Sequence, residues 1–190
     1  MRHFWRFLEK NIIKKSDFFF TTDEFRLKFI SRYYKIKRNK IGYILNVPQA
    51  KKLMLNKNIL KEKLSLKNKF VVSYCGGIIK GRGIELIIDA FSNFYENKKD
   101  CVLVLAGSVE DVYLNELNRL IIKLKINVDS IIFTGKLKNT LLMKYMYASD
   151  ITFALYNNIS LNNRMCSPNK IFDALHSKTH VITTDSFFII

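Results

Sequence analysis

The sequence lacks the features that would carry it into or across a membrane. No apolar run approaches the roughly 20 residues that a membrane-spanning helix needs. The opening MRHFWRFLEKNIIKKSD has charges throughout. It therefore has neither the uninterrupted apolar core nor the small-residue cleavage site of a signal peptide. These absences leave association with a membrane surface open.

Cysteine is scarce, and the three cysteines stand far apart, at Cys75, Cys101 and Cys166. Their spacing matches no metal-binding motif. An odd number of cysteines also does not fit the even-numbered disulfide frameworks of small secreted domains. We therefore expect no metal site. The pattern fits a reducing compartment and predicts a cytoplasmic protein.

Acidic residues are also few, 16 against 32 Lys and Arg, for a formal net charge of +16. This excess favours an anionic partner such as nucleotide, nucleic acid or anionic lipid, without choosing among them. Much of the positive charge comes from Lys, and Asn and Ile are also abundant. A general compositional bias of the source organism therefore explains the excess of basic residues equally well. With 190 residues and 48% hydrophobic content, the chain can form one well-buried core and a small appendage.

The first quarter of the chain predicts a helix, a strand and a second helix. Apolar residues recur at helical spacing through residues 2–15 and again up to Tyr34, and the run Phe18-Phe19-Phe20 lies between. Residues 41–45 predict another short strand. Asn46-Val47-Pro48 interrupts it, because proline restricts its own backbone and its neighbour's. We place a domain boundary there, between residues 1–45 and 46–190.

From Lys69 onwards, strands and helices alternate. The predicted strands are FVVSY, CVLVLAG, SIIFTG, DITFALY and HVITTD. They are rich in Val and Ile without alternation, which indicates strands covered by helices on both faces. The predicted fold is α/β, a doubly wound, Rossmann-like parallel sheet. Ligands of such sheets bind beyond the carboxyl ends of the strands, so the informative residues should follow these runs.

A glycine-rich segment follows the first of these strands. It places glycine at positions 76, 77, 81 and 83, with Lys80 and Arg82 among them. Glycine lets backbone approach a ligand, helix-start amides point at it, and the cations neutralise its charge. The segment therefore fits a phosphate or diphosphate cradle. An ordinary strand-to-helix turn is the alternative, since this is not the GxGxxG fingerprint.

A second helix start lies at Ser167-Pro168-Asn169-Lys170. Ser can cap a helix and Pro suits its first position, which leaves the following amides open to an anion. Asp173 would lie more than one turn along this helix and could accept hydrogen bonds from sugar hydroxyls. A well-capped surface helix is an equally good interpretation of the same residues.

Together these elements resemble the donor domain of GT-B glycosyltransferases, particularly the large retaining group 1, or family 4-like, enzymes. Further segments that match in order are Gly83-Ile84-Glu85-Leu86, Val102-Leu103-Val104-Leu105-Ala106-Gly107, Ile131-Ile132-Phe133-Thr134-Gly135 and Tyr147-Ala148-Ser149-Asp150. The resemblance implies that the chain binds a nucleoside-diphosphate sugar as donor substrate and uses no other cofactor. It does not identify the sugar.

The resemblance also assigns roles to single residues. Arg82 and Lys80 would stabilise the departing diphosphate, which requires no metal in principle. The expected donor-binding residues are Gly76, Gly77, Gly83, Gly135, Lys136, Ser167, Asn169, Lys170 and Asp173. Among them Asp173 falls where the family usually has a ribose-binding Glu, and Gly135 and Lys136 fall near the base.

By the same comparison, residues 1–45 look like the end of the acceptor domain. We therefore expect most of that domain to be absent before Met1 and the last donor-domain elements to be absent after Ile190. Three positions depart from the family pattern. Met165 replaces the first acidic residue of a paired-Glu motif, Lys178 stands where Gly is expected, and His180 stands where Pro is expected. A left-handed Lys178 would cost on the order of 1 kcal/mol, and His180 is interpreted as a strand-end residue.

Three hypotheses follow. In the first, the chain is a retaining, hexosyltransferase-like donor module whose full enzyme extends a cell-surface glycan such as lipopolysaccharide or capsule. Its acceptor would be a glycan or lipid-linked glycan at the inner face of the cell membrane, and a partner chain would supply the missing acceptor half. In the second, it is a non-catalytic remnant or a subunit of a split enzyme. In the third, it is a basic protein that contacts nucleic acid or anionic lipid through phosphate attraction alone. Among the partners, nucleic acid is disfavoured.

Overall fold

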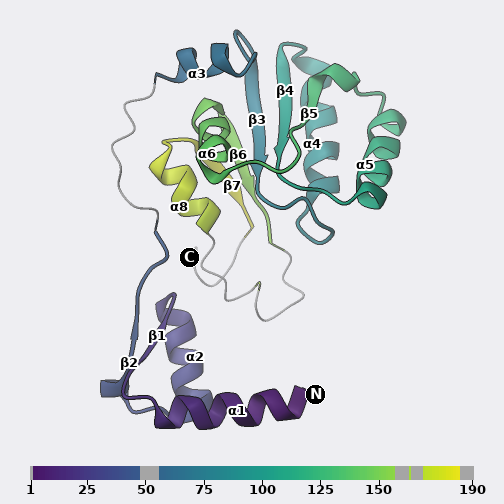
Figure 1. Ribbon diagram of the computed structural model, residues 1–190. Coiled ribbons are helices and arrows are strands. Elements are labelled where there is room, and N and C mark those ends of the chain that lie inside the picture. The colour runs from purple at the N-terminus through teal and green to yellow at the C-terminus, as the bar shows by residue number, and fades with distance from the viewer. Residues whose placement is uncertain (1, 48–55, 157–162, 164–168, 185–190) are drawn as a thin grey trace. The chain divides into compact units, whose positions relative to one another are not determined.

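The computed structural model describes residues 2–47, 56–156, 163 and 169–184, which fall into two compact units. We call residues 2–47 the N-terminal unit, and residues 56–156 with 169–184 the sheet unit. Figure 1 labels the helices and strands of both.

The N-terminal unit contains two helices and a two-stranded parallel sheet. Its elements are α1 (Arg2–Lys15), β1 (Phe19–Thr21), α2 (Glu24–Tyr34), the 3-10 helix η1 (Arg38–Lys40) and β2 (Ile41–Tyr43). In the sheet Phe19 lies opposite Ile41. The buried Asp23 caps α2, because its carboxylate accepts a 2.7 Å hydrogen bond from the Arg26 amide. The predicted helix, strand and helix are confirmed.

The sheet unit is an α/β fold with five parallel strands, as predicted. Its elements are α3 (Lys57–Lys63), β3 (Phe70–Cys75), α4 (Ile84–Asn97), β4 (Cys101–Ala106), α5 (Asp111–Lys123), η2 (Val128–Ser130), β5 (Ile131–Phe133), α6 (Asn139–Ala148), β6 (Ile151–Ala154), α8 (Asn169–His176) and β7 (His180–Thr183). Residues that alternate along β3 and β4 enter different hydrophobic clusters, which explains the unbroken apolar runs. One cluster contains residues of α4 and α5, and the other contains residues of α3, α6 and α8, so helices cover both faces (Figure 1).

The strand order β5-β4-β3-β6-β7 places a switch point between β3 and β6. From β3 the chain builds outwards to β4 and β5 and then returns to place β6 on the other side of β3. The connections that leave the carboxyl ends of β3 and β6 therefore diverge. In doubly wound sheets this divergence opens the crevice in which ligands bind.

Asp150 joins three elements of the sheet unit just before β6. Its carboxylate accepts hydrogen bonds from Lys57 at 2.8 Å, from Lys61 at 2.6 Å and from the Val71 amide at 2.8 Å. Burial opposes ionisation, but the hydrogen bonds from the two lysines and the amide outweigh it and lower the pKa of Asp150. The aspartate of the Tyr147–Asp150 motif thus fastens α3 to β3 and β6.

We expect Asp150→Asn to lower the free energy of unfolding by about 2 kcal/mol at neutral pH, because both lysines lose their anionic partner. Since the folded-state pKa is lowered, the stabilisation is present above the usual carboxyl pKa and is lost as the pH falls through the folded value. Denaturant unfolding of both proteins at pH 7 and under acid conditions measures this. Asp100→Asn is the control, because Asp100 is 86% exposed and lies 3.9 Å from Lys69. Equal losses in the two variants would contradict the structural role of Asp150.

Two of the residues that depart from the family pattern are described by the structure. Lys178 adopts a left-handed backbone with φ 54°, as expected for a residue that stands in a glycine position. His180 is exposed and is the first residue of β7, which confirms its interpretation as a strand-end residue. Met165 lies outside the described residues.

Candidate functional site

The candidate site lies beyond the carboxyl ends of β3 and β6, at the switch point. The glycine-rich segment 76–83 connects β3 to α4, and Leu155 and Tyr156 follow β6. The start of the segment is fixed against the end of β4. The Gly76 amide donates a 2.8 Å hydrogen bond to the Ala106 carbonyl, and the Ile78 amide donates one of 2.9 Å to Ser108.

Gly76 makes room for Lys170, which reaches the segment from α8. A Cβ atom at Gly76 would lie 2.6 Å from Lys170 Cε and 3.1 Å from Nζ. The Lys170 ammonium donates a 2.6 Å hydrogen bond to the Tyr74 hydroxyl and lies 4.0 Å from the centre of that ring. The Tyr74 hydroxyl in turn donates to the Gly77 carbonyl at 3.0 Å. Two residues predicted from separate segments, Gly76 and Lys170, are therefore in direct contact.

Arg82 approaches the same place from the other end of the segment. Its guanidinium carbon lies 5.0 Å from the ring centre of Tyr156, and Lys170 Nζ lies 5.9 Å from that ring centre. Tyr156 is buried. Two cations from distant segments thus lie near one aromatic ring at the switch point. Because like charges repel, this arrangement is best stabilised by an anion between or beside them.

The nearest ionisable groups on β3 do not supply that anion. Burial raises the pKa of Tyr74, although the nearby Arg82 opposes the shift. Burial also raises the pKa of the Cys75 thiol to about 12, although the nearby charge of Lys170 opposes the shift. Both groups are therefore neutral at pH 7. Cys75 is consequently a buried, unreactive thiol.

Lys80 points elsewhere. Its ammonium pairs with Glu116 of α5 at 2.7 Å and lies 5.7 Å from the Tyr113 ring centre. Both partners of this ion pair are substantially exposed, 65% for Lys80 and 43% for Glu116, so the pair contributes at most about 1 kcal/mol. The structure does not bring Lys80 to Arg82, and its predicted role at the diphosphate stays a prediction that requires the pair to open.

Two glycines at this edge meet very different surroundings. A Cβ atom at Gly77 would meet no atom within 4 Å. A Cβ atom at Gly107, which follows β4, would overlap the carbonyl of Gly76, and the φ of Gly107 is 155°. Gly77 therefore faces open space in which a ligand can approach, whereas Gly107 is required for the close packing of the two strand ends.

The remaining glycines predicted at the site lie at the same edge. Gly83 begins α4, where a Cβ atom would lie 2.9 Å from Leu155 Cδ1. Gly83 has no side chain to cap α4, so the first-turn amides of this helix remain available to an anion. Gly135 follows β5 and bridges to Gly107, and the exposed Lys136 comes next.

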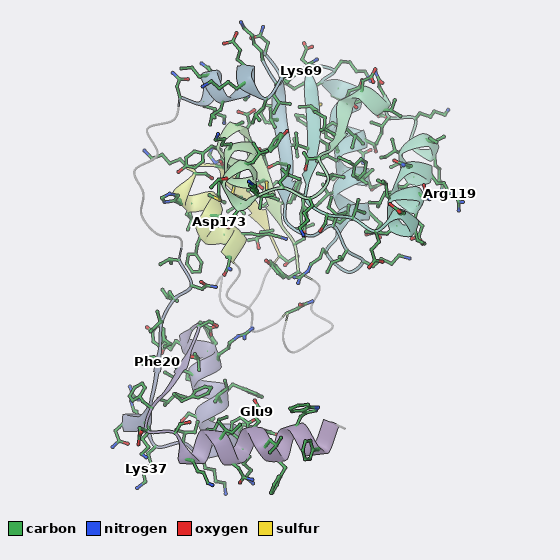
Figure 2. All side chains as sticks on the ribbon, viewed as in Figure 1. Glu9, Phe20, Lys37, Lys69, Arg119 and Asp173 are labelled. Carbon is green, nitrogen blue, oxygen red and sulfur yellow. The ribbon has the colours of Figure 1, made fainter. Side chains whose placement is uncertain are left out.

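The predicted residues of the second helix start are only partly described. Asn169 is exposed and Lys170 half-buried at the start of α8, and Ser167 lies outside the described residues. Asp173 lies one turn further along α8 (Figure 2) and is half-buried. Burial raises its pKa, and the charge of His176 opposes the shift. A partly desolvated carboxylate in this position can accept hydrogen bonds from hydroxyl groups.

Three contributors were assigned no role from the sequence: Tyr74, Tyr156 and Gly107. Each lies at or directly after the carboxyl end of a strand, on FVVSY, DITFALY and CVLVLAG. That placement is the signal that could have found them. Their specific roles depend on partners more than 70 residues away for the two tyrosines.

The described part of the chain offers neither a metal-binding cluster nor a membrane-spanning helix. It contains no group of three or more His, Cys, Asp or Glu side chains placed to hold a metal ion. None of its helices has both the length and the apolar character to cross a bilayer.

Residues 56–189 match the family model described as glycosyl transferases group 1. No curated protein sequence matches the chain.

Solved structures share the fold at low sequence identity. HepE of Anabaena, solved in complex with UDP-glucose, is 17% identical with a TM-score of 0.67, over 90% of this chain and 45% of that one. WaaG, a glycosyltransferase involved in lipopolysaccharide biosynthesis, is 15% identical with a TM-score of 0.65, over 88% and 44%. Sucrose-phosphate synthase of Thermosynechococcus elongatus is 18% identical with a TM-score of 0.70, over 95% and 43%. The chain therefore spans less than half the length of each of these proteins.

Proposed function

Because the chain belongs to the glycosyl transferases group 1 family, we propose that its sheet unit binds a nucleoside-diphosphate sugar at the switch point. One observation carries the proposal: Arg82 and Lys170 converge on Tyr156, beside the open space at Gly77 and the start of α4. A diphosphate placed there would be met by two cations and by helix-start amides.

The chemistry proposed for this site is stabilisation of a leaving group. When a sugar leaves a nucleoside diphosphate, negative charge develops on the phosphate oxygens. Cations already held in place reduce the barrier to that step. We assign this role to Arg82 and Lys170, and to Lys80 once its exposed pair with Glu116 opens, without a metal ion.

The nucleoside would be recognised by neighbouring loops. Asp173 on α8 is proposed to accept hydrogen bonds from the ribose hydroxyls, and Gly135 with Lys136 to lie near the base. Asn169 and Ser167 would contribute to the anion site at the start of α8. HepE, which has the same fold, was solved with UDP-glucose, and this supports a nucleotide-sugar ligand of this class.

The acceptor is proposed to be a cell-surface glycan or a lipid-linked glycan. WaaG, which has the same fold, is involved in lipopolysaccharide biosynthesis, and this supports the proposal. Transfer of the sugar to this acceptor would take place at the cytoplasmic face of the cell membrane, with the protein in peripheral contact with that membrane. An acceptor domain beyond the elements seen in residues 2–47 would be needed to hold this acceptor.

Calorimetric titration of the folded chain with UDP, GDP, ADP and CDP tests the proposal. We expect saturable binding of at least one of them, accompanied by a rise in the midpoint of thermal unfolding. If none of the four gives heat or a thermal shift with a sample shown to be folded, the donor site is wrong.

Arg82→Ala is expected to weaken binding of the preferred nucleoside diphosphate by about tenfold or more, and Asp173→Ala by less. A charge-assisted contact with phosphate is worth more than a hydrogen bond to a neutral hydroxyl. Calorimetry of both variants measures the order. Arg82→Lys keeps the charge and should recover part of the affinity, and thermal unfolding of each variant verifies its fold. Unchanged affinity in Arg82→Ala would mean that segment 76–83 is only a turn.

A further inference from the structure

The N-terminal unit contains a basic pocket that the proposed donor site does not explain. It has a volume of about 560 Å³, and four lysines line it: Lys10, Lys35, Lys37 and Lys40. Lys10 comes from α1, Lys35 and Lys37 follow α2, and Lys40 ends η1. The exposed position of Lys37 on this unit can be seen in Figure 2.

Among the described residues, no acidic side chain forms an ion pair with these lysines. Asp23 and Glu24 pair with basic residues of α2 itself, and Glu9 and Asp17 are exposed and do not line the pocket. Among the described side chains of residues 2–47, no carboxylate forms an ion pair with any of the four lysines. The carboxyl end of α2 carries only about half a negative charge. That partial charge can account for one nearby cation but not for four.

The rest of the pocket wall is apolar and aromatic. Ile13 is buried and Ile36 half-buried, and the rings of Tyr33 and Tyr34 meet edge to face with their centres 4.8 Å apart. Tyr33 also stacks on Phe29 at 5.9 Å, which holds its ring in place. The lysines therefore surround a concave surface with a fixed wall, unlike a flat face covered by solvated side chains.

The pocket lies away from the edge of the small sheet where β1 and β2 end. α1 leads into the start of β1, and η1 leads directly into the start of β2. Because the two strands are parallel, their starts lie together, at the edge opposite their carboxyl ends. The described lining comes entirely from the N-terminal unit, so this pocket shares no residue with the site at β3 and β6.

We propose that this pocket binds a ligand bearing two or more phosphate charges, independently of the nucleotide-sugar site. Four ammonium groups around one concavity supply the attraction, and phosphate is the common biological anion with enough charge to balance them. The phosphate can come from a free pyrophosphate or sugar phosphate, or from the headgroup of an anionic lipid. The chemistry of recognition is the same for both sources.

Acylation of lysines in the full chain, read at each residue by mass spectrometry, tests the proposal. Sodium pyrophosphate should slow the modification of Lys10, Lys35, Lys37 and Lys40 by about threefold or more relative to the exposed Lys63 and Lys144 of the sheet unit. The residue-level readout separates this pocket from the donor site, so failure of one proposal leaves the other intact.

A charge-matched pair of variants completes the test. Lys37→Gln with Lys40→Gln should abolish protection of Lys10 and Lys35, whereas Lys123→Gln with Lys138→Gln, which removes the same charge at exposed positions of the sheet unit, should leave it unchanged. Vesicles of phosphatidylcholine with and without phosphatidic acid, whose phosphomonoester carries up to two negative charges, form the lipid arm. Protection only by the anionic vesicles would identify a lipid headgroup, and protection by pyrophosphate would identify a soluble phosphate. Protection by neither, or equal protection in both double variants, would overturn the proposal.

Discussion

Gly107→Ala is expected to destabilise the sheet unit by about 4 kcal/mol or more, enough to unfold a domain of ordinary stability. The new methyl group would overlap the Gly76 carbonyl, which is backbone and cannot rotate aside as a side chain can. The ends of β3 and β4 would have to separate, which breaks the hydrogen bond from the Gly76 amide to Ala106. The φ of 155° adds strain for any residue with a side chain. Denaturant unfolding followed by circular dichroism measures the loss.

Gly77→Ala is the matched control at the same edge of the sheet. No atom lies within 4 Å of the added methyl group, so we expect a change in stability of less than about 1 kcal/mol. Because that methyl group would occupy the space proposed for the diphosphate, nucleotide affinity should nevertheless fall. Wild-type stability in Gly107→Ala would show that the close approach of the two strand ends is wrong. Wild-type nucleotide affinity in Gly77→Ala would show that the ligand does not approach Gly77.

The fold could be predicted because its signals are local. Unbroken runs such as Val102–Ala106 lie between two hydrophobic clusters, and only strands covered on both faces need that composition. From the sequence, Gly76 and Lys170 were placed in the same donor site, but the sequence did not predict that the two residues lie against each other. The reason for this contact, that a Cβ atom at Gly76 would displace the lysine side chain, depends on how α8 packs beside β6 and β7, which brings Lys170 to the end of β3.

Other features of the site could not be predicted because they depend on strand order. Arg82 reaches Tyr156 only because β6 lies beside β3, and nothing in either segment specifies that neighbour. Likewise Lys80 stands two residues from Arg82 in the sequence but pairs with Glu116, which α5 brings to that side. Asp150 belonged to a recognised motif, but its physical role became clear only from its contacts with Lys57, Lys61 and Val71.

The chain alone is expected to transfer no sugar, even when it binds the donor. Placing an acceptor oxygen against the reacting carbon supplies up to roughly 7–11 kcal/mol of rate enhancement, or about five to eight orders of magnitude. Within residues 2–47 the structure describes two α-helices, one short 3-10 helix and a two-stranded parallel sheet. Parallel sheets are normally covered on both faces, yet Phe20 of β1 is 58% exposed, and Trp5 of α1 is 64% exposed. We therefore expect this unit not to form a complete acceptor site by itself, and its exposed apolar side chains favour association.

Incubation with radiolabelled nucleotide sugars and a crude lipid-linked glycan extract tests this expectation, with size-exclusion chromatography of the same sample. We expect no labelled glycan and elution as an associated species. Calorimetric binding of a nucleoside diphosphate by that sample is the control, because it separates a competent donor site without an acceptor from a protein that has lost its fold. Phe20→Ser with Trp5→Ser should shift the elution towards the monomer without changing nucleotide affinity, since neither residue belongs to the sheet unit. Robust transfer by a monomer would contradict the proposal that a further acceptor domain is needed, and it would assign the acceptor site to the elements within residues 2–47.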